Sequence, residues 1–362
     1  MRKFEVAAMK KILKNQATRT NFITYGGVIL AFILLQGLSA AGALSSSLKG
    51  QLVPICAYVV MALSLNLTVG VLGELSLGHA GFMSIGAFSG AVAAAAMTDS
   101  IASSPIRLAV AMIIGAAIAG VSGALIGIPV LRLKGDYLAI VTLAFGEIIK
   151  SIINNLYIGI DVNGLHASFL NNTITFGDGG RMILSGPMGI PGIQKISSFT
   201  GGFLLIMITL IIIFNLVDSR AGRAIMALRD NRIAAESVGI PVTKYKMMAF
   251  VTSAALAGAA GALFSLGQNT IIASKFDFNT SILILVFVVL GGQGRMWGSI
   301  VAAAALTILP EMLREFADYR MLIYAIVLIV VMLFTNSAGA KQFTAKIKGM
   351  FVRDIEGGEQ NG

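Results

Sequence analysis

Charged residues are scarce in this chain: they make up 12% of its 362 residues, about half the fraction of an ordinary soluble domain. Hydrophobic residues make up 56%, more than one soluble core can hold, so lipid must solvate part of the chain. The apolar runs are continuous, whereas the strands of a membrane β-barrel alternate apolar and polar residues. The sequence therefore predicts an all-α membrane protein, and its 41 glycines favour closely packed helices.

Residues and motifs for metal, redox or nucleotide chemistry are also few. Cys56 is the single cysteine, and His79 and His166 are the only histidines. One cysteine forms no intramolecular disulfide. The sequence holds no H-E-x-x-H, C-x-x-C or G-x-S-x-G motif, and no Gly-Lys pair, so a Walker A loop is absent too. We therefore predict no catalytic residue, no metal and no cofactor bound by this chain.

Ten apolar segments approach the length of about 20 residues that a membrane helix needs. They lie near 22–44, 52–70, 75–98, 106–128, 137–158, 200–217, 247–268, 281–292, 296–310 and 321–336. The short pair 281–292 and 296–310 is interpreted as two half-spanning helices or as one broken unit. Segment 22–44 also resembles a cleaved signal peptide with an A-x-A-like site, but its length and the spans that follow favour an uncleaved helix.

The positions of the basic residues predict the orientation. With ten spans, 19 of the 27 Lys and Arg fall on one side, mainly in the N-terminal segment 1–21, loop 218–246 and the tail 337–362. The positive-inside rule places that side, and therefore both termini, in the cytoplasm. Clusters between spans indicate contact with membrane lipid and not with nucleic acid, despite the net charge of +10. We interpret 22–336 as one transmembrane domain, with 159–199 as its long outer loop.

Two glycine-rich stretches, 66–90 and 289–298, interrupt apolar runs. The tripeptide Val-Leu-Gly precedes both interruptions, at 71–73 and at 289–291. Paired interruptions in two halves of a transporter are typical of the transport pathway and suggest an inverted repeat with broken or half helices. Backbone groups that such a break frees must line a cavity or be covered by protein.

Polar side chains within or beside the spans are the candidates for transport. Those of the two glycine-rich stretches are the predicted pathway residues Glu74, Ser76, His79 and Gln293. The alternative is close helix packing, with Glu74 and His79 near the cytoplasmic interface. Glu147 and Lys150 are spaced i,i+3 on one face of a span, which predicts an intramembrane ion pair.

The loop 218–246 is too polar to span the membrane but has helical character from Gly222 to Val238. Its apolar positions on a basic background are Ile225, Leu228, Ile233 and Val238. Gly239 and Pro241 then end the helix. From spacing alone, an interfacial helix on anionic lipid and a docking helix for a cytoplasmic partner are equally good interpretations.

Several segments together resemble the permease subunits of branched-chain amino-acid ABC importers, specifically the LivM type. They are LSLGHAGFMSIGAF (75–88), LRLKGDYLAIVTLAFGEIIK (131–150), GPMGIPGI (186–193), SRAGRAIMALRDNRIAAESVGIPVTKYKMMAF (219–250), AGAAGALFS (257–265) and VVLGGQGRMWGSIVAA (288–303). They cover about 52–335 in the order of the family. Segment 159–185 departs from the pattern and resembles an insertion in the outer loop.

The resemblance implies a non-catalytic half-pore in the bacterial inner membrane. Its implied partners are a second, homologous permease of the LivH type, two ATP-binding cassette subunits that bind the ATP, and a periplasmic amino-acid-binding protein. The coupling motif E-A-A-x-x-x-G of such permeases is matched here by Ala234, Ala235 and Gly239, with Glu236 displaced inside the motif and Ile233 at its first position. The resemblance favours the docking helix.

Leucine, isoleucine and valine are the substrates that the resemblance implies. The same scaffold in other permeases carries urea, short amides or sugars, and the sequence contains no recognisable selectivity filter. An ion-coupled secondary transporter is the alternative from another class, with Glu147 as the candidate acid at the midplane. A membrane enzyme would need a catalytic constellation, and the sequence contains no known catalytic motif.

Overall fold

The computed structural model describes residues 2–42, 45–98, 100–133, 136–161, 164–170 and 180–313, with 322, 325, 326 and 329; for 2–20 it describes the backbone alone. The predicted span 321–336 and tail 337–362 thus lie outside the described residues, apart from those single positions. The chain divides into two compact units, Met1–Thr307 and Ile308–Gly362. Of the second unit, the structure describes the end of one helix and the four single positions.

The described elements are mostly helical. In chain order they are α1 Arg2–Ala40, α2 Ser46–Asn66, the π-helical η1 Leu67–Leu72, α3 His79–Ala96, α4 Ser104–Val130, α5 Asp136–Asn154, β1 Leu156–Asp161, β2 Gly164–Phe169, β3 Arg181–Ser185, the 3-10 helix η2 Gly186–Met188, α6 Phe199–Asp218, α7 Arg220–Asp230, α8 Arg232–Ser237, α9 Val242–Ser265, the 3-10 helix η3 Ala273–Phe276, α10 Phe278–Gly291 and α11 Met296–Met312.

Seven helices of the described part are long and apolar enough to cross a membrane: α1, α2 with η1, α3, α4, α5, α6 and α9. The short apolar helices α10 and α11 occupy the pair of segments predicted to be short. The chain is therefore a multi-pass helical membrane protein, as predicted. The count of ten spans and the cytoplasmic location of both termini stay predictions.

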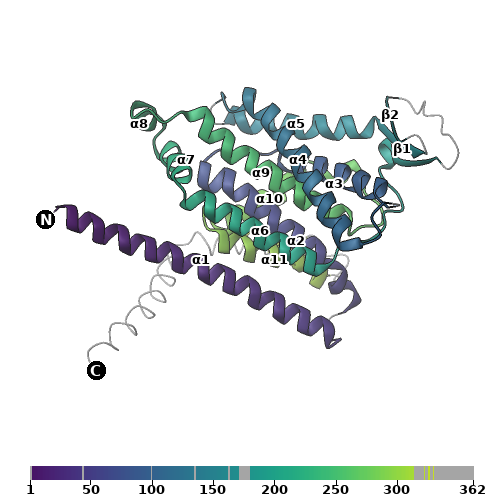
Figure 1. Ribbon diagram of the computed structural model, residues 1–362, viewed down its shortest axis with the longest axis horizontal. Coiled ribbons are helices and arrows are strands. Elements are labelled where there is room, and N and C mark those ends of the chain that lie inside the picture. Colours follow the sequence, from purple (N-terminus) through teal and green to yellow (C-terminus); the bar gives the residue numbers. More distant parts are fainter. Residues whose placement is uncertain are drawn as a thin grey trace. The chain divides into compact units, whose positions relative to one another are not determined.

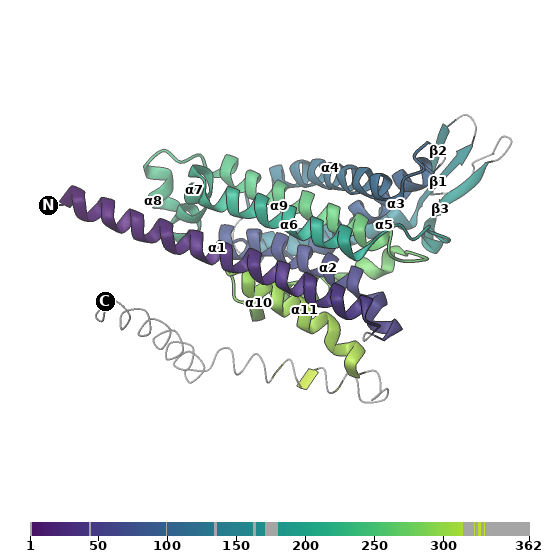
Figure 2. The same cartoon turned by 60° about the horizontal axis from the view of Figure 1, so that its bottom comes forward.

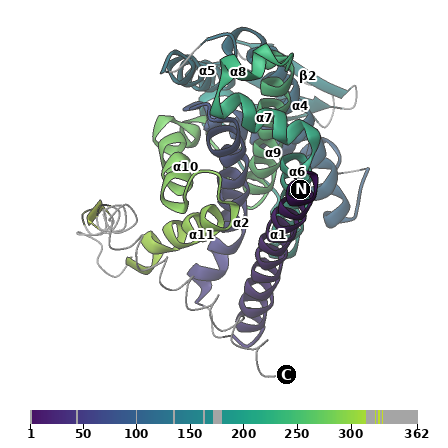
Figure 3. The ribbon, with the colours of Figure 1, turned by 90° about the vertical axis from the view of Figure 1, so that its left-hand side faces the viewer.

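Helix α9 is the centre of the first unit, where it packs against α2, α3 and α4 (Figures 1 and 3). Small residues allow this approach, because a methyl group at Gly86 of α3 would overlap the backbone of Gly258 in α9. A Cβ at Gly258 would in turn lie 2.5 Å from the carbonyl oxygen of Gly115 in α4. Helix α2 is almost wholly buried, while α1, α4, α5 and α6 keep large apolar faces exposed. Those faces are the ones available to lipid.

The loop between α5 and α6 contains a small antiparallel sheet in the strand order β2-β1-β3. Strand β1 pairs with β2 from Leu156↔Phe169 to Asp161↔Gly164, and its pairing with β3 shifts at a bulge between Ile158 and Gly159. The prediction of an all-α protein is therefore wrong for this loop. The predicted span 137–158 is also too long, since α5 ends at Asn154.

The sheet and the helices α7 and α8 lie at opposite ends of the first unit (Figures 1 and 2). Helix α6 leads from the sheet end to α7, and α9 leads back from α8. Helix α1 contains the basic N-terminal segment and the first apolar run as one continuous helix. The fold thus places the loop between α5 and α6 at the opposite end of the first unit from loop 218–246, as the predicted topology requires.

Candidate functional site

The two glycine-rich interruptions touch each other at the end of the bundle near α7. The first is η1, where α2 loosens into a π-helix, and the second is the turn between α10 and α11. The backbone N–H of Gly294 donates to Asn66 Oδ1 at 2.8 Å, and Asn66 Nδ2 donates to Ser299 Oγ at 2.9 Å. A methyl group at Gly70 would overlap the backbone of Gly294. The fully buried Asn66 therefore uses its amide to satisfy a backbone group that the second break frees.

Arg229 of α7 joins the loop 218–246 to this junction. Its Nη1 donates to the carbonyl oxygen of Gly70 at 2.9 Å. Gly73 ends η1 with a φ of +79°, and a Cβ there would lie 2.5 Å from Arg229 Cγ. Charged donors make the stronger hydrogen bonds, so this contact is a firm link between a surface helix and a break in a buried one. From the sequence, Arg229 is only one of the basic residues of loop 218–246, because nothing in the sequence pairs it with a carbonyl 159 residues away.

The predicted pathway residues differ in their surroundings. Glu74 forms an ion pair with Lys246 of α9, and both side chains are mostly buried. Ser76 is buried, and its hydroxyl has no hydrogen-bond partner among the described residues. Gln293 is exposed in the turn before α11. A pathway role for these residues stays a prediction.

His79, the fourth pathway candidate, is the first residue of α3 and is buried against α2. Its Nε2 lies 2.7 Å from Ser64 Oγ, which in turn lies 2.9 Å from the carbonyl oxygen of Met61. A carbonyl only accepts, so the Ser64 hydroxyl donates to Met61 and the His79 Nε2–H donates to Ser64. The described contacts of His79 thus belong to helix packing, which was the alternative interpretation.

The loop 218–246 folds as two short helices and not as the single helix predicted from Gly222 to Val238. Asn231 separates them with φ −155° and ψ 102°, and its Oδ1 accepts from Ala234 N at 3.0 Å as the N-cap of α8. A polar side chain that caps a new helix favours such a break. Gly239, at φ +84°, then ends this pair of helices, as predicted.

The apolar residues of the pair fall into two sets. Ile225 and Leu228 of α7 are buried against the bundle. Ile233 and Val238 are 80% and 75% exposed. Ile233 belongs to α8 and Val238 is its C-cap, and large apolar side chains exposed within one short segment are candidates for a contact surface. We call these two residues the apolar tip of the loop.

The four predicted coupling residues differ in exposure. Ala234, Glu236 and Gly239 are exposed, whereas Ala235 is 4% exposed and buried within this chain. Glu236 accepts from Arg232 Nε at 3.1 Å along the exposed side of α8. In this structure the side chain of Ala235 is therefore not available for direct contact with a partner.

Glu147 and Lys150 form an ion pair on α5, with Oε2 and Nζ 2.5 Å apart. Both side chains are partly exposed. Among the described residues, no group of three or more His, Cys, Asp or Glu side chains is placed to hold a metal ion.

The fold and these contacts define a class: a multi-pass helical membrane protein in which a surface loop is hydrogen-bonded to one of two touching helix breaks. Residues 47–334 match the family described as the branched-chain amino acid transport system permease component. This match covers more than half of the chain, which therefore belongs to that family.

Individual relatives agree with the family match. The high-affinity branched-chain amino acid transport system permease proteins LivM of Salmonella typhimurium (strain LT2) and Escherichia coli (strain K12) are each 35% identical over 288 residues. Each alignment covers 76% of this chain and 66% of the relative, so the chain spans slightly less than two thirds of their length. The ribose import permease protein RbsC of Escherichia coli (strain K12) is 28% identical over 287 residues, covering 76% of this chain and 81% of RbsC. No solved structure is significantly similar to the chain.

Proposed function

We propose that this chain is the permease subunit of an ATP-binding cassette importer that moves leucine, isoleucine and valine into the cytoplasm. Family membership and the names of the two LivM relatives support this substrate class. The chain itself catalyses no reaction, because separate ATPase subunits bind the ATP. The complex contains a second homologous permease, two ATPase subunits and a periplasmic amino-acid-binding protein, and it resides in the bacterial inner membrane.

The observation that carries the proposal is the hydrogen bond from Arg229 to the Gly70 carbonyl oxygen. An ATPase subunit docks on the apolar tip, formed by Ile233 and Val238, and ATP-driven closure of the ATPase pair displaces α7 and α8. Arg229 passes that displacement to η1, and the close contact between Gly70 and Gly294 passes it to the α10–α11 turn. Both breaks then move together and change which end of the pathway is open.

The contacts of loop 218–246 support the transfer of this displacement to the membrane helices. Ile225 and Leu228 anchor α7 to the bundle, so a push on α8 is carried into the membrane helices. The exposed apolar tip offers a partner surface to bury, and the exposed Ala234, Glu236 and Gly239 surround it. Ala235 is buried, and its carbonyl oxygen accepts from Ile240 N at 3.1 Å beyond the C-terminal end of α8.

Ile233→Arg tests the docking surface, because the change adds a charge to an exposed side chain and leaves the buried anchor untouched. Purified complexes with the ATPase subunits are reconstituted in vesicles, and leucine uptake is measured with ATP and the binding protein. We expect the variant to retain less ATPase subunit and to lose uptake by roughly tenfold or more, as for a residue central to an interface. Met188→Arg, which alters an exposed apolar residue at the sheet end, is the matched control.

Full uptake by Ile233→Arg would remove the apolar tip from the proposal. Uptake that needs no ATPase subunit and collapses with an ion gradient would favour a secondary transporter instead. The 28% identity to RbsC gives one specific alternative substrate, a sugar. Ribose and urea are therefore included as competitors, and competition by either one at the level of unlabelled leucine would replace the substrate assignment.

A further inference from the structure

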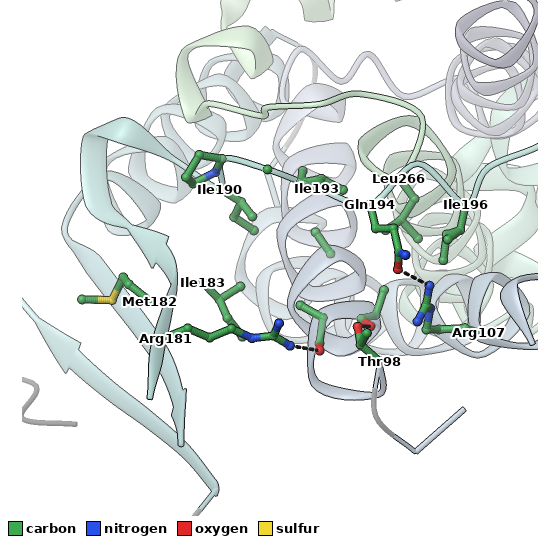
Figure 4. Close-up of a pocket in the computed structure, with 15 residues that line it drawn as sticks. Thr98, Arg107, Arg181, Met182, Ile183, Ile190, Ile193, Gln194, Ile196 and Leu266 are labelled. Carbon is green, nitrogen blue, oxygen red and sulfur yellow. Dashed lines mark hydrogen bonds between the residues drawn. The ribbon is translucent and has the colours of Figure 1, made fainter. Parts of the chain in front are cut away.

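A cavity of about 290 Å³ lies at the sheet end of the first unit, away from loop 218–246. Its wall comes from the end of α3, the start of α4, strand β3 and the segment 190–196 (Figure 4). This segment is fixed by backbone hydrogen bonds, in which Ile190 N donates to Ile271 O at 3.0 Å and Ile193 N donates to Asn269 O at 2.9 Å. The wall is therefore formed by the fold and not by a free loop.

Two guanidinium groups reach this cavity from opposite sides (Figure 4). Arg107 of α4 is 4% exposed, and its Nη2 donates to Gln194 Oε1 at 2.5 Å. Its buried Nε has no hydrogen-bond partner among the described residues. Arg181 of β3 is exposed and donates through Nη2 to the carbonyl oxygen of Ala95 at 3.1 Å. Neutral oxygens thus accept from both side chains.

A buried cation without an anion is costly, so such groups are normally paired. Within the described part of the chain, neither Arg107 nor Arg181 has a carboxylate partner, and the cavity lining contains no Asp or Glu. An incoming anion would offset the cost of burying the positive charge of Arg107. The cavity is therefore complementary to a negatively charged group.

The rest of the lining is mostly aliphatic. It includes Ala91 and Ala94 from α3, Ile183 from β3, Ile190 and Leu266. The volume is near the lower end for small-molecule pockets, which begin at about 300 Å³. Polar and apolar groups share the exposed lining about equally, which suits a small ligand with one polar end and one aliphatic end. These features fit a short aliphatic acid better than a large or fully polar solute.

We propose that this cavity binds a small carboxylate with a branched aliphatic tail. The carboxylate pairs with the Arg107 guanidinium, Arg181 adds a second positive charge at the rim, and the tail contacts the aliphatic lining. The identity of the natural ligand rests on the proposed function: it is the branched-chain amino acid itself, held at the outer end before it crosses.

Binding of tritiated leucine to the full-length chain in phosphatidylcholine nanodiscs, without ATP or binding protein, tests this site. We expect Arg107→Gln to weaken binding by roughly tenfold or more, because it removes a charge-assisted hydrogen bond. Lys195→Gln, which removes an exposed charge beside the cavity but outside its lining, should bind as the unaltered chain does. Two competitors test whether the carboxylate or the amino group of leucine is recognised. We expect 3-methylbutanoate to displace leucine and 3-methylbutylamine not to displace it.

Equal affinity of Arg107→Gln and the unaltered chain would overturn the site, as would displacement by the amine as effective as by the acid. If Arg107→Gln does not fold, Arg181→Gln at the exposed rim decides between the same outcomes. Nanodiscs with phosphatidylglycerol test a lipid phosphate as the occupant, and loss of leucine binding there would overturn the proposal.

ATP-driven uptake, measured separately, distinguishes this site from the proposed function. Normal leucine uptake together with unaltered binding by Arg107→Gln would overturn the site and leave the function standing. Binding of 3-methylbutanoate that needs Arg107, with no leucine uptake by the unaltered complex, would support the site and overturn the function.

Discussion

Gly70 illustrates at the scale of one residue how the absence of a side chain holds the junction together. The backbones of η1 and the α10–α11 turn approach so closely that a Cβ at Gly70 would overlap Gly294 and the amide oxygen of Asn66. The carbonyl oxygen of Gly70 also accepts a hydrogen bond from Arg229 Nη1. One position therefore joins three segments that are far apart in the sequence.

Gly70→Ala is expected to separate η1 from the α10–α11 turn. Overpacking of a close contact costs about 1–3 kcal/mol, so we expect a lower thermal midpoint and reduced ATP-driven uptake. Gly50→Ala is the matched control, because it lies in the same continuous span and its added methyl group would meet no atom within 4 Å. Thermal unfolding and uptake are measured for both variants. Equal behaviour of the two would show that the contact at Gly70 carries no constraint.

At the scale of secondary structure, hydropathy predicted most helices because a membrane helix needs a long apolar run wherever it packs. The apolar runs at 281–292 and 296–310 are too short for a full span and predicted a pair of short helices, which the structure contains as α10 and α11. The sheet was not predicted, since its strands have five or six residues and lie in a polar, glycine-containing loop. Such short alternations carry little signal beside the long apolar runs.

The candidate site was less predictable than the helices. The matching Val-Leu-Gly tripeptides indicated that two breaks belong together, and the structure brings Gly70 and Gly294 into contact. The break at Asn231 was missed because the apolar spacing continues across it, although Ile225 is buried and Ile233 is exposed. Spacing along one helix cannot tell which apolar residues the bundle covers. Arg229 was missed because its partner is a backbone carbonyl. Every residue has one, so residue types do not identify the partner.

Helix α10 offers a prediction at this scale, because it begins at a titratable cap. Asp277 Oδ1 accepts from Thr280 N at 2.9 Å, and Oδ2 accepts from Asn279 Nδ2 at 3.0 Å. Burial acts to raise the pKa of the Asp277 carboxyl, but the hydrogen bonds from Thr280 and Asn279 prevail, and the pKa lies below its ordinary value. A lowered folded-state pKa means that the carboxylate stabilises the fold above the unfolded-state pKa, and that this contribution is lost as pH falls through the folded-state pKa.

Asp277→Ala is therefore expected to lower stability at neutral pH by about 0.5–2 kcal/mol, the usual cost of losing an N-cap. The gap in thermal midpoint between this variant and the unaltered chain should narrow as pH falls below about 3.9, the ordinary pKa of aspartate. Asp277→Asn is the control, because asparagine also caps helices and does not titrate. A gap that stays constant from pH 7 to pH 3 would mean that the carboxylate charge does not stabilise α10.

At the scale of the whole molecule, the distribution of basic residues and the structure give independent evidence on the membrane topology. The basic residues predict that loop 218–246 faces the cytoplasm. The structure independently places α7 and α8 at the end opposite the sheet (Figures 1 and 2). If the charge rule holds, the sheet must face the periplasm, and so must the cavity between Arg107 and Arg181. The orientation of the proposed ligand site therefore depends on one topological assignment.

Cysteine labelling can test that assignment without a cysteine-free background, because Cys56 is the single cysteine and is buried. In spheroplasts treated with a membrane-impermeant maleimide, we expect Leu165→Cys at the exposed side of β2 to react and Val238→Cys to remain unlabelled. In inverted vesicles the two should exchange behaviour. The unaltered chain controls for Cys56 and should stay unlabelled in both preparations.

A cysteine appended after Gly362 extends the test to the part of the chain that the structure leaves undescribed. An even number of spans places this cysteine on the same side as Val238→Cys, whereas an odd number places it with Leu165→Cys. Nineteen of the 27 basic residues share one side only if the number is even, so labelling with Val238→Cys is the expected result. Labelling from outside would mean an odd number of spans: either segment 321–336 does not cross the membrane or another predicted span is wrong. The basic tail 337–362 would then lie outside, against the charge rule.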